Sequence, residues 1–176
     1  MITGQPIGVQ IQGLQVVPPV GLAGIVREFG DVREFVEVDG CLDARWEMES
    51  LQVVPLPFPL RLAWDHSKAV SSFRCHRRLV GIFADVFERI VAVGLASKVT
   101  SFGGCFTYRL QRTGAKLSTH SWGIAIDLNP ETNALGCAGD MDPGVVRVFR
   151  DFGFEWGGGW VGHGRDPMHF QFCAGY

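Results

Sequence analysis

Residues 118–129 read STHSWGIAIDLN, and the second half of this stretch has the pattern of a short, half-buried strand. Apolar residues at every second position from Ile124 to Leu128 would form one face of that strand. Asp127 falls between them and is therefore predicted to point away from the core. The stretch predicts a β-strand that carries a carboxylate on its polar face.

A histidine precedes this strand at a spacing that requires a bend in the chain. Strict alternation would place His120 and Asp127 on opposite faces, because an odd number of positions separates them. Gly123 lies between them and is the residue at which the chain can bend or bulge. With that bend, we expect the imidazole and the carboxylate to face the same point.

A second stretch, RDPMHFQF at 165–172, repeats this design. Its two phenylalanines share one face of a predicted strand, while His169 and Gln171 share the other face. Asp166 precedes His169 by three positions, in a turn that contains proline. A carboxylate so close in sequence to a ligand histidine is well placed to contact a water molecule held by a metal ion.

The two stretches together supply the groups that a zinc hydrolase needs. A catalytic zinc site has three protein ligands and one open position, and zinc lowers the pKa of bound water to about 7. We expect one Zn²⁺ ion on His120, Asp127 and His169, with Asp166 left over as the general base. Each residue alone has an ordinary explanation as a structural histidine, a strand-end aspartate or a surface turn, but their combination favours a metal site.

The motifs SxHxxGxAxD, WGGxW and DxMHFQ resemble those of the zinc D-alanyl-D-alanine carboxypeptidase and L-alanyl-D-glutamate endopeptidase family. This family includes many phage endolysins and shares its zinc-site fold with lysostaphin-type peptidases and the hedgehog signalling domain. The resemblance covers roughly residues 70–173 and implies the same zinc ligands, with Asp166 as catalytic acid and base. The matching residues are Ser118, His120, Gly123, Ala125, Asp127, Trp156, Gly157, Gly158, Trp160, Asp166, Met168, His169, Phe170 and Gln171.

The resemblance also implies an arginine upstream of the first histidine, which steadies a substrate carboxylate or the developing oxyanion. The segment FTYRLQRTG offers two, and the spacing favours Arg109 as the catalytic one, with Arg112 as second choice and substrate contact. Ser118 is a further expected substrate contact. His163 is interpreted as a solvated loop residue and is left out of the site.

The glycine-rich segment WGGGWVGHGRDP at 156–167 is predicted to form one wall of the cleft. Trp156 and Trp160 would supply an apolar surface there, and the glycines would let a peptide backbone approach. The alternative is a tight turn with two packed indoles.

The remaining pattern predicts an α+β fold in a single domain, with a small antiparallel sheet that carries the zinc site and helices packed on one face. Helices are expected at 21–29, 67–94 and 143–152, the last capped by Asp142. Residues 31–64 suggest one or two strands, with the proline-rich LPFPL turning the chain, and VTSFGGCFTYRL at 99–110 suggests two strands around a Gly-Gly turn.

We expect residues 1–60 to form an N-terminal arm with accessory elements, of which the first 20 pack on the domain or are partly disordered. Residues 61–176 would form the zinc peptidase core. Five cysteines without CxxC spacing indicate neither a disulfide framework nor a cysteine zinc site, and buried free thiols are expected.

Composition restricts the partners. A formal net charge of −2 gives no electrostatic reason to bind nucleic acid or an anionic membrane, and the sequence has no apolar run long enough to span a bilayer. The first residues lack the pattern of a secretory signal. We therefore expect a monomer that stays in the cytoplasm of the producing cell and acts on the cell wall after release.

The predicted function is hydrolysis of an amide bond in the peptide stem of bacterial peptidoglycan by a zinc metallopeptidase, most simply an endolysin-like L-alanyl-D-glutamate endopeptidase. A D-alanyl-D-alanine carboxypeptidase is the alternative within the same chemistry. Two alternatives do not involve hydrolysis of peptidoglycan. The chain could be a zinc-stabilised binding or structural module, or a part of a larger phage structure. An intact Asp166 favours the enzyme, because a purely structural site needs no proton acceptor beside the metal.

Overall fold

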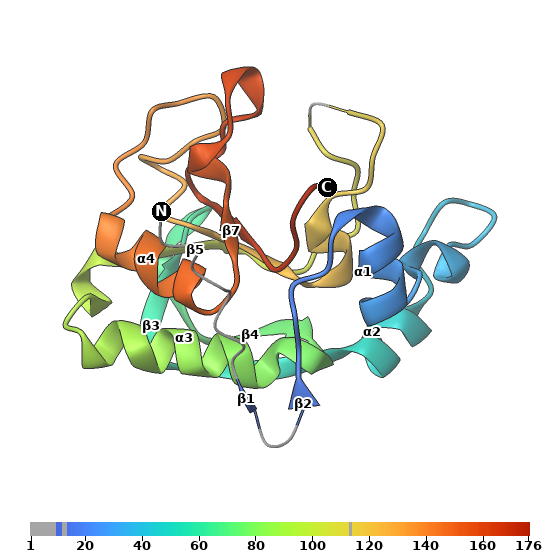
Figure 1. Ribbon diagram of the computed structural model, residues 1–176, viewed down its shortest axis with the longest axis horizontal. Coiled ribbons are helices and arrows are strands. Elements are labelled where there is room, and N and C mark those ends of the chain that lie inside the picture. The colour runs from blue at the N-terminus through green and yellow to red at the C-terminus, as the bar shows by residue number, and fades with distance from the viewer. Residues whose placement is uncertain (1–9, 12–13, 113) are drawn as a thin grey trace, which may run out of the picture.

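A mixed sheet forms the centre of the computed structural model, which describes residues 10–11, 14–112 and 114–176. Among these residues six strands join in the order β4-β3-β5-β6-β8-β7, and β1 and β2 form a separate small ladder (Figure 1). The strands are β1 Gln10–Ile11, β2 Leu14–Gln15, β3 Leu51–Leu62, β4 Asp65–His76, β5 Ser101–Gly104, β6 Ala125–Leu128, β7 Glu155–Trp156 and β8 His169–Gln171. The helices are α1 Gly21–Phe29, α2 Ala44–Ser50, α3 Val80–Ala92 and α4 Pro143–Asp151. The predicted α+β class and single domain are confirmed.

The half of the sheet that carries the predicted ligands is antiparallel. Strand β6 pairs with β5 and β8, and β8 pairs with β7, all in opposite directions. Among the described strands of this sheet, only β3 and β5 run parallel, because the chain leaves β4 through α3 before it returns beside β3. The sheet is therefore mixed as a whole, although its site-bearing half has the predicted antiparallel arrangement.

The core lies on the face of the sheet opposite the predicted ligands. Phe170 of β8 stacks on Phe149 of α4 with ring centroids 4.1 Å apart, and Phe83 of α3 packs edge-on against Phe73 of β4. Helices α3 and α4 thus cover the apolar face of the sheet, as predicted. Because successive residues of a strand point to opposite faces, His169 and Gln171 face away from this core.

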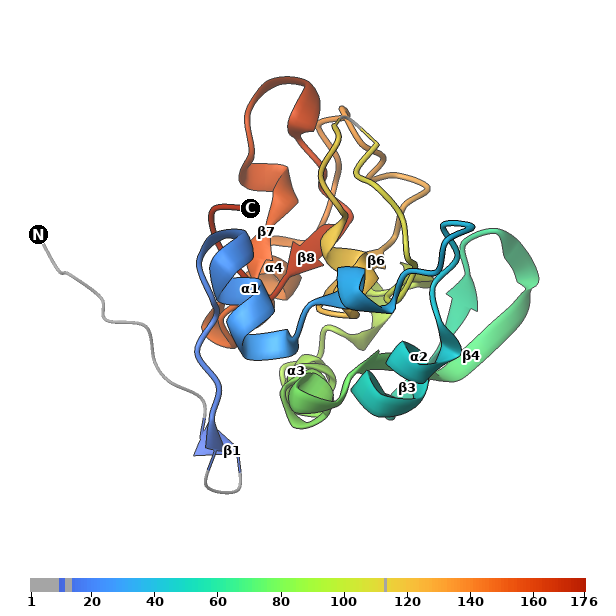
Figure 2. The same cartoon turned by 90° about the vertical axis from the view of Figure 1, so that its right-hand side faces the viewer.

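The helix predicted at 67–94 is correct only in its second half. Residues 65–76 form β4, which pairs with β3 in a long hairpin that extends away from the rest of the domain (Figure 2). Phe73 and Cys75 are buried while Arg74 between them is exposed, which is strand periodicity. Pairing with β3, far enough away in sequence to be missed by a local pattern, decides the conformation here. The apolar stripe of α3 begins only after Leu79.

The LPFPL segment was predicted to turn the chain, and this prediction is wrong. It lies inside β3, and the turn of the hairpin is at Ala63 and Trp64. Pro55, Pro57 and Pro59 occupy alternate exposed positions, so their missing N–H groups fall along one edge of the strand. The pairing with β4 is irregular between Pro55 and Leu60, and β5 pairs with β3 only beyond this stretch. The prolines are tolerated because no neighbouring strand among the described residues pairs with that edge of β3 at these positions, so no N–H groups are needed there.

Two further expectations need correction. Residues 44–50 form α2 rather than a strand, because the Asp43 carboxylate accepts a hydrogen bond from the Arg45 N–H and caps a helix. Residues 105–109 do not form the second strand predicted after the Gly-Gly turn. This segment is held instead by a hydrogen bond from Thr107 N to His120 O and one from Arg109 N to Ser121 Oγ.

Several local predictions are confirmed. Helix α1 spans Gly21–Phe29 and ends at Gly30, whose φ of 85° suits glycine. Helix α4 begins after Asp142, whose carboxylate accepts a hydrogen bond from Gly144 N at 2.8 Å. Of the five free cysteines, Cys75, Cys105 and Cys173 are buried as predicted, whereas Cys41 and Cys137 are exposed.

The predictions for the first residues are only partly addressed. Residues 1–9 and 12–13 lie outside the described residues, and the predicted boundary at residue 60 falls within β3. The division into an arm and a core stays a prediction. No helix among the described residues is long and apolar enough to cross a membrane.

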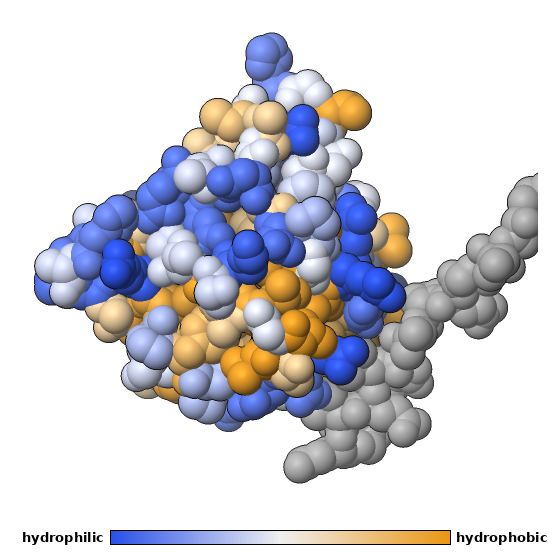
Figure 3. Space-filling view, turned by 90° about the vertical axis from the view of Figure 1, so that its left-hand side faces the viewer, coloured by the Kyte–Doolittle hydropathy of each residue, from blue (hydrophilic) through white to orange (hydrophobic). Residues whose placement is uncertain are grey.

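Apolar side chains are exposed on one side of the molecule, around the ends of α3 and α4 (Figure 3). Val91 and Val93 at the end of α3 are 42% and 41% exposed. The loops on either side of the predicted site, residues 105–112 with 114–117 and residues 157–165, rise from the upper edge of the sheet in Figure 1. The apolar surface therefore lies apart from these loops.

Candidate metal centre and active site

A bend at Gly123 turns His120 toward Asp127. Residues Thr119–Trp122 form a single 3-10 turn, in which the Ser118 hydroxyl accepts a hydrogen bond from His120 N. Gly123 then adopts a φ of 67°, and a Cβ at this position would lie 2.9 Å from His76 N. Both the conformation and the close approach require glycine. The bend predicted from the alternation is therefore present at the predicted residue.

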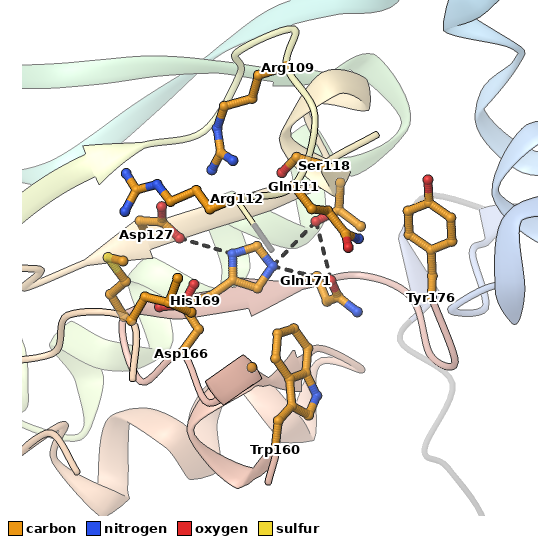
Figure 4. Close-up of a pocket in the computed structure, with 14 residues that line it drawn as sticks. Arg109, Gln111, Arg112, Ser118, Asp127, Trp160, Asp166, His169, Gln171 and Tyr176 are labelled. Carbon is orange, nitrogen blue, oxygen red and sulfur yellow. Dashed lines mark hydrogen bonds and ion pairs between the residues drawn. The ribbon is translucent and has the colours of Figure 1, made fainter. Parts of the chain in front are cut away.

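Two imidazoles and one carboxylate converge at this point. Asp127 and His169 are directly opposite in the pairing of β6 with β8, so their side chains leave the sheet side by side. Asp127 Oδ1 lies 3.0 Å from His169 Nδ1 and 3.2 Å from His120 Nε2, and the two histidine nitrogens are 3.2 Å apart. All three residues are buried. Figure 4 shows Asp127 and His169 meeting at the edge of a pocket.

The spacing of these atoms fits a zinc ion. Ligand atoms about 2.0–2.2 Å from a tetrahedral zinc lie roughly 3.3–3.6 Å from one another. The observed separations of 3.0–3.2 Å are close to this value. His120 Nδ1 lies 2.7 Å from the carbonyl oxygen of Cys105, which can only accept, so this nitrogen carries the proton and Nε2 has its lone pair free. The cluster could therefore hold one metal ion.

The electrostatics of the cluster follow from burial and proximity. Burial alone would raise the pKa of Asp127, but the adjacent His120 and His169 outweigh burial and hold this pKa well below its usual range. Burial opposes the charged form of His169, yet hydrogen bonding and attraction to Asp127 raise the pKa of this imidazole. The site is thus built to keep a carboxylate ionised among nitrogen ligands.

A pocket of about 290 Å³ opens beside the cluster. Of the residues predicted for the site, Arg109, Arg112, Ser118, Asp127, Trp160, Asp166 and His169 line it. His120 lies behind the pocket wall, in contact with Asp127 and His169. His163 is exposed in its loop and does not line the pocket.

Asp166 is a half-buried carboxyl group at the wall of this pocket. Its Oδ1 is buried and makes no hydrogen bond within the described part of the chain. Burial and repulsion from Asp127 raise its pKa to about 6, against the opposing attraction of His169, His120 and Arg112. A carboxylate of this kind can accept a proton near neutral pH and release it again.

The two arginines give the pocket a positively charged side. The Arg109 guanidinium donates one hydrogen bond to the carbonyl of Leu110, and Arg112 is exposed. Neither forms an ion pair with an acidic side chain among the residues that the structure describes. Figure 4 shows both guanidinium groups on the same side of the pocket as Asp127. This arrangement suits an anionic ligand.

The two tryptophans differ in position. The Trp160 ring lies 5.6 Å from the His169 ring, and its indole N–H donates to Glu155 at 2.6 Å. Trp156 does not line this pocket, because its indole N–H donates to Pro167 O at 2.7 Å and its ring faces Arg150 of α4. The structure therefore brings Trp160 into the site but leaves Trp156 outside it.

Some lining residues were given no role from the sequence. Thr119, Gln111 and Tyr176 line the pocket, as does Gln171, which had been noted only as part of a motif. The two-residue spacing between His169 and Gln171 was a usable signal, because it places both side chains on one face of β8. No sequence pattern indicated Tyr176, which reaches the pocket because Ala174 pairs with Val20.

Comparison with known proteins supports a peptidase. Residues 111–172 match the model of a protein family described as D-alanyl-D-alanine carboxypeptidase. This range, about a third of the chain, contains the three clustered residues and Asp166 but not Arg109. A search of curated proteins finds no match to the chain. The match supports a hydrolase, and this family implies a zinc ion and a peptidoglycan substrate.

Proposed function

We propose that this chain is a zinc peptidase that hydrolyses an amide bond in the peptide stem of bacterial peptidoglycan, between L-alanine and D-glutamate. The observation that carries the proposal is the buried cluster of His120, Asp127 and His169 at the wall of a pocket that also contains Asp166. The resemblance of the motifs to L-alanyl-D-glutamate endopeptidases supports the choice of bond.

In this proposal the three clustered residues hold zinc, which when bound would polarise the scissile carbonyl and acidify a water molecule. Asp166 accepts the proton of the attacking water, because a carboxyl group whose pKa is about 6 is mostly ionised at neutral pH. The same carboxyl group then donates this proton to the leaving amine.

Arg109 and Arg112 orient the substrate. Their guanidinium groups can donate charge-assisted hydrogen bonds to a substrate carboxylate, or to the oxyanion that develops during attack. The peptide stem carries such carboxylates, whereas an ordinary internal peptide bond does not. Ser118 and Trp160 complete the contacts, with the indole as an apolar wall beside His169.

A second candidate is removal of the terminal D-alanine by a D-alanyl-D-alanine carboxypeptidase. The family matched by residues 111–172 carries this description. In that reaction the arginines would bind the terminal carboxylate of the substrate. The zinc ligands and Asp166 would keep the same roles, so the two candidates differ only in the bond that is cut.

The test is digestion of purified peptidoglycan by the zinc-loaded protein beside Asp166→Ala, with His163→Ala as a matched loop control outside the pocket. We expect the wild type and the control to release fragments, and Asp166→Ala to bind zinc without cutting. A new amino group on D-glutamate identifies the endopeptidase, and free D-alanine identifies the carboxypeptidase. If the wild type binds zinc and cuts no wall type, the chain is a zinc-stabilised binding module and the proposal is wrong.

The proposal extends to an endolysin-like role, in which the enzyme degrades the wall when it gains access to it. Support comes from the phage endolysins among the proteins that the motifs resemble. Purified protein added to cells whose outer barriers have been removed should then lower their turbidity. Activity on isolated stem peptides alone, without lysis of any intact wall, would contradict this role.

A further inference from the structure

Gln171 is a buried amide on β8, between β6 and the edge strand β7, beside the candidate metal centre. It lies on β8, opposite Ala125 on one side and Glu155 on the other, and is only 3% exposed. An amide removed from water costs free energy unless its oxygen and nitrogen find partners. Its contacts therefore indicate what the side chain does.

Those contacts lead to His169. Gln171 Oε1 lies 3.2 Å from His169 Nε2 and accepts a hydrogen bond from the Thr119 hydroxyl at 3.2 Å. Thr119 Oγ1 itself lies 3.3 Å from His169 Nε2. The amide nitrogen of Gln171 is directed to Cys173 O at 3.5 Å, which orients the oxygen toward the imidazole.

This arrangement selects one tautomer of His169. The Thr119 hydroxyl donates its hydrogen bond to Gln171 Oε1. Thr119 Oγ1 and Gln171 Oε1 therefore both face His169 Nε2 as acceptors. A nitrogen that faces two acceptors carries a proton, so the opposite nitrogen, Nδ1, is the one that can give up its proton and offer a lone pair to a metal ion. That nitrogen is the one that lies 3.0 Å from Asp127 Oδ1 in the cluster.

We propose that Gln171, supported by Thr119, is a positioning residue that holds His169 in the tautomer and orientation needed to bind zinc through Nδ1. The inference rests on the proposed zinc site. It adds a role for two buried polar residues that the hydrolytic reaction itself does not use. Neither residue is expected to contact the reacting atoms.

Substitution of Gln171 separates positioning from packing. Gln171→Met keeps the volume but removes the acceptor, and zinc affinity should fall by about 10- to 100-fold. Gln171→Glu keeps an acceptor oxygen for His169, and its zinc affinity should stay within about threefold of the wild type. If Gln171 only packs, the order reverses, because a buried carboxylate is tolerated less well than methionine.

The measurements are zinc affinity by competition with a chelator and thermal unfolding of each metal-free variant. Gln52→Met, at an exposed glutamine of β3, is the matched control and should bind zinc like the wild type. Nitrogen-15 NMR of the zinc-loaded wild type should show a protonated Nε2 on His169 and a protonated Nδ1 on His120. The opposite tautomer of His169 would overturn the inference.

Two comparisons complete the test. If Gln171→Met does not fold, Thr119→Val should still weaken zinc binding, by up to about tenfold, while Thr119→Ser retains it. Equal zinc affinities for Gln171→Met and the wild type would overturn the inference and leave the proposed zinc site intact. A wild type that binds no zinc would instead overturn the proposed function, and the inference with it.

Discussion

Asp166 combines two properties that are costly in a folded protein, a buried oxygen without a hydrogen bond and a pKa raised to about 6. Both arise because the chain partly buries this carboxyl group and places it where Asp127 repels its charged form. The raised pKa means that the folded protein binds this proton more tightly than the unfolded chain does. Ionisation of Asp166 therefore lowers stability as the pH rises from about 4 through 6. Proteins retain such groups where their chemistry requires them.

The first prediction concerns the pH dependence of this group. Asp166→Asn removes the charge but keeps the shape, so the metal-free variant should be more stable than the wild type at pH 7.5, by on the order of 1 kcal/mol after allowance for solvent screening. At pH 3.5 the difference should vanish, because the wild-type group is then protonated. Urea unfolding of both metal-free proteins at the two pH values measures this. Lower stability of Asp166→Asn at pH 7.5 would contradict it.

Gly123 is the second residue whose role can be isolated. Gly123→Ala adds a Cβ 2.9 Å from His76 N at a φ of 67°, whereas Gly94→Ala has a φ of 76° with open space around it. Gly94→Ala should therefore cost about 1 kcal/mol for conformation alone, and Gly123→Ala about 2–4 kcal/mol. Only Gly123→Ala should also weaken zinc binding, because it displaces His120. Equal effects of the two substitutions on stability and on zinc binding would rule out the crowding argument.

At the scale of single elements, the start of α4 tests two roles for Asp142. It either caps the helix or, together with Asp140, binds a cation such as calcium. Asp142→Ala should lower the free energy of unfolding by about 1 kcal/mol, because the Gly144 N–H loses its acceptor. Asp151→Ala, at the exposed end of the same helix, is the control and should have little effect. Thermal unfolding with and without calcium measures both. A loss of stability that appears only in calcium would favour a cation site.

The elements also show what the sequence could predict. Strands β6 and β8 were predictable because each has period-two alternation in a few residues, and Gly123 marked the bend between His120 and Asp127. Strand β4 was not predictable, because its pairing with β3, which extends to Leu51 opposite His76, outweighs the local pattern. The direction of the Trp156 indole could not be predicted from the sequence either, because it depends on contacts with the carbonyl of Pro167 and with Arg150 of α4.

At the scale of the whole molecule, the sheet separates the core from the site. The aromatic side chains of α3, α4 and β8 pack on one face, and the clustered ligands lie on the other. None of the three clustered residues is part of this hydrophobic core in the described part of the chain. We therefore expect the chain to differ from small domains that unfold when zinc is removed.

The last prediction follows from this separation. The metal-free protein should remain folded, with near-native far-ultraviolet circular dichroism, but it should unfold at a lower temperature than the zinc-loaded protein. Zinc at 100 times its dissociation constant should stabilise the fold by about 2.7 kcal/mol, because it binds the folded state and not the unfolded one. His120→Ala should abolish this zinc-dependent shift, while His66→Ala, at an exposed histidine of β4, should preserve it. Calorimetry with zinc and with a chelator measures both effects, and a chain that unfolds completely in chelator would show that the ion is structural.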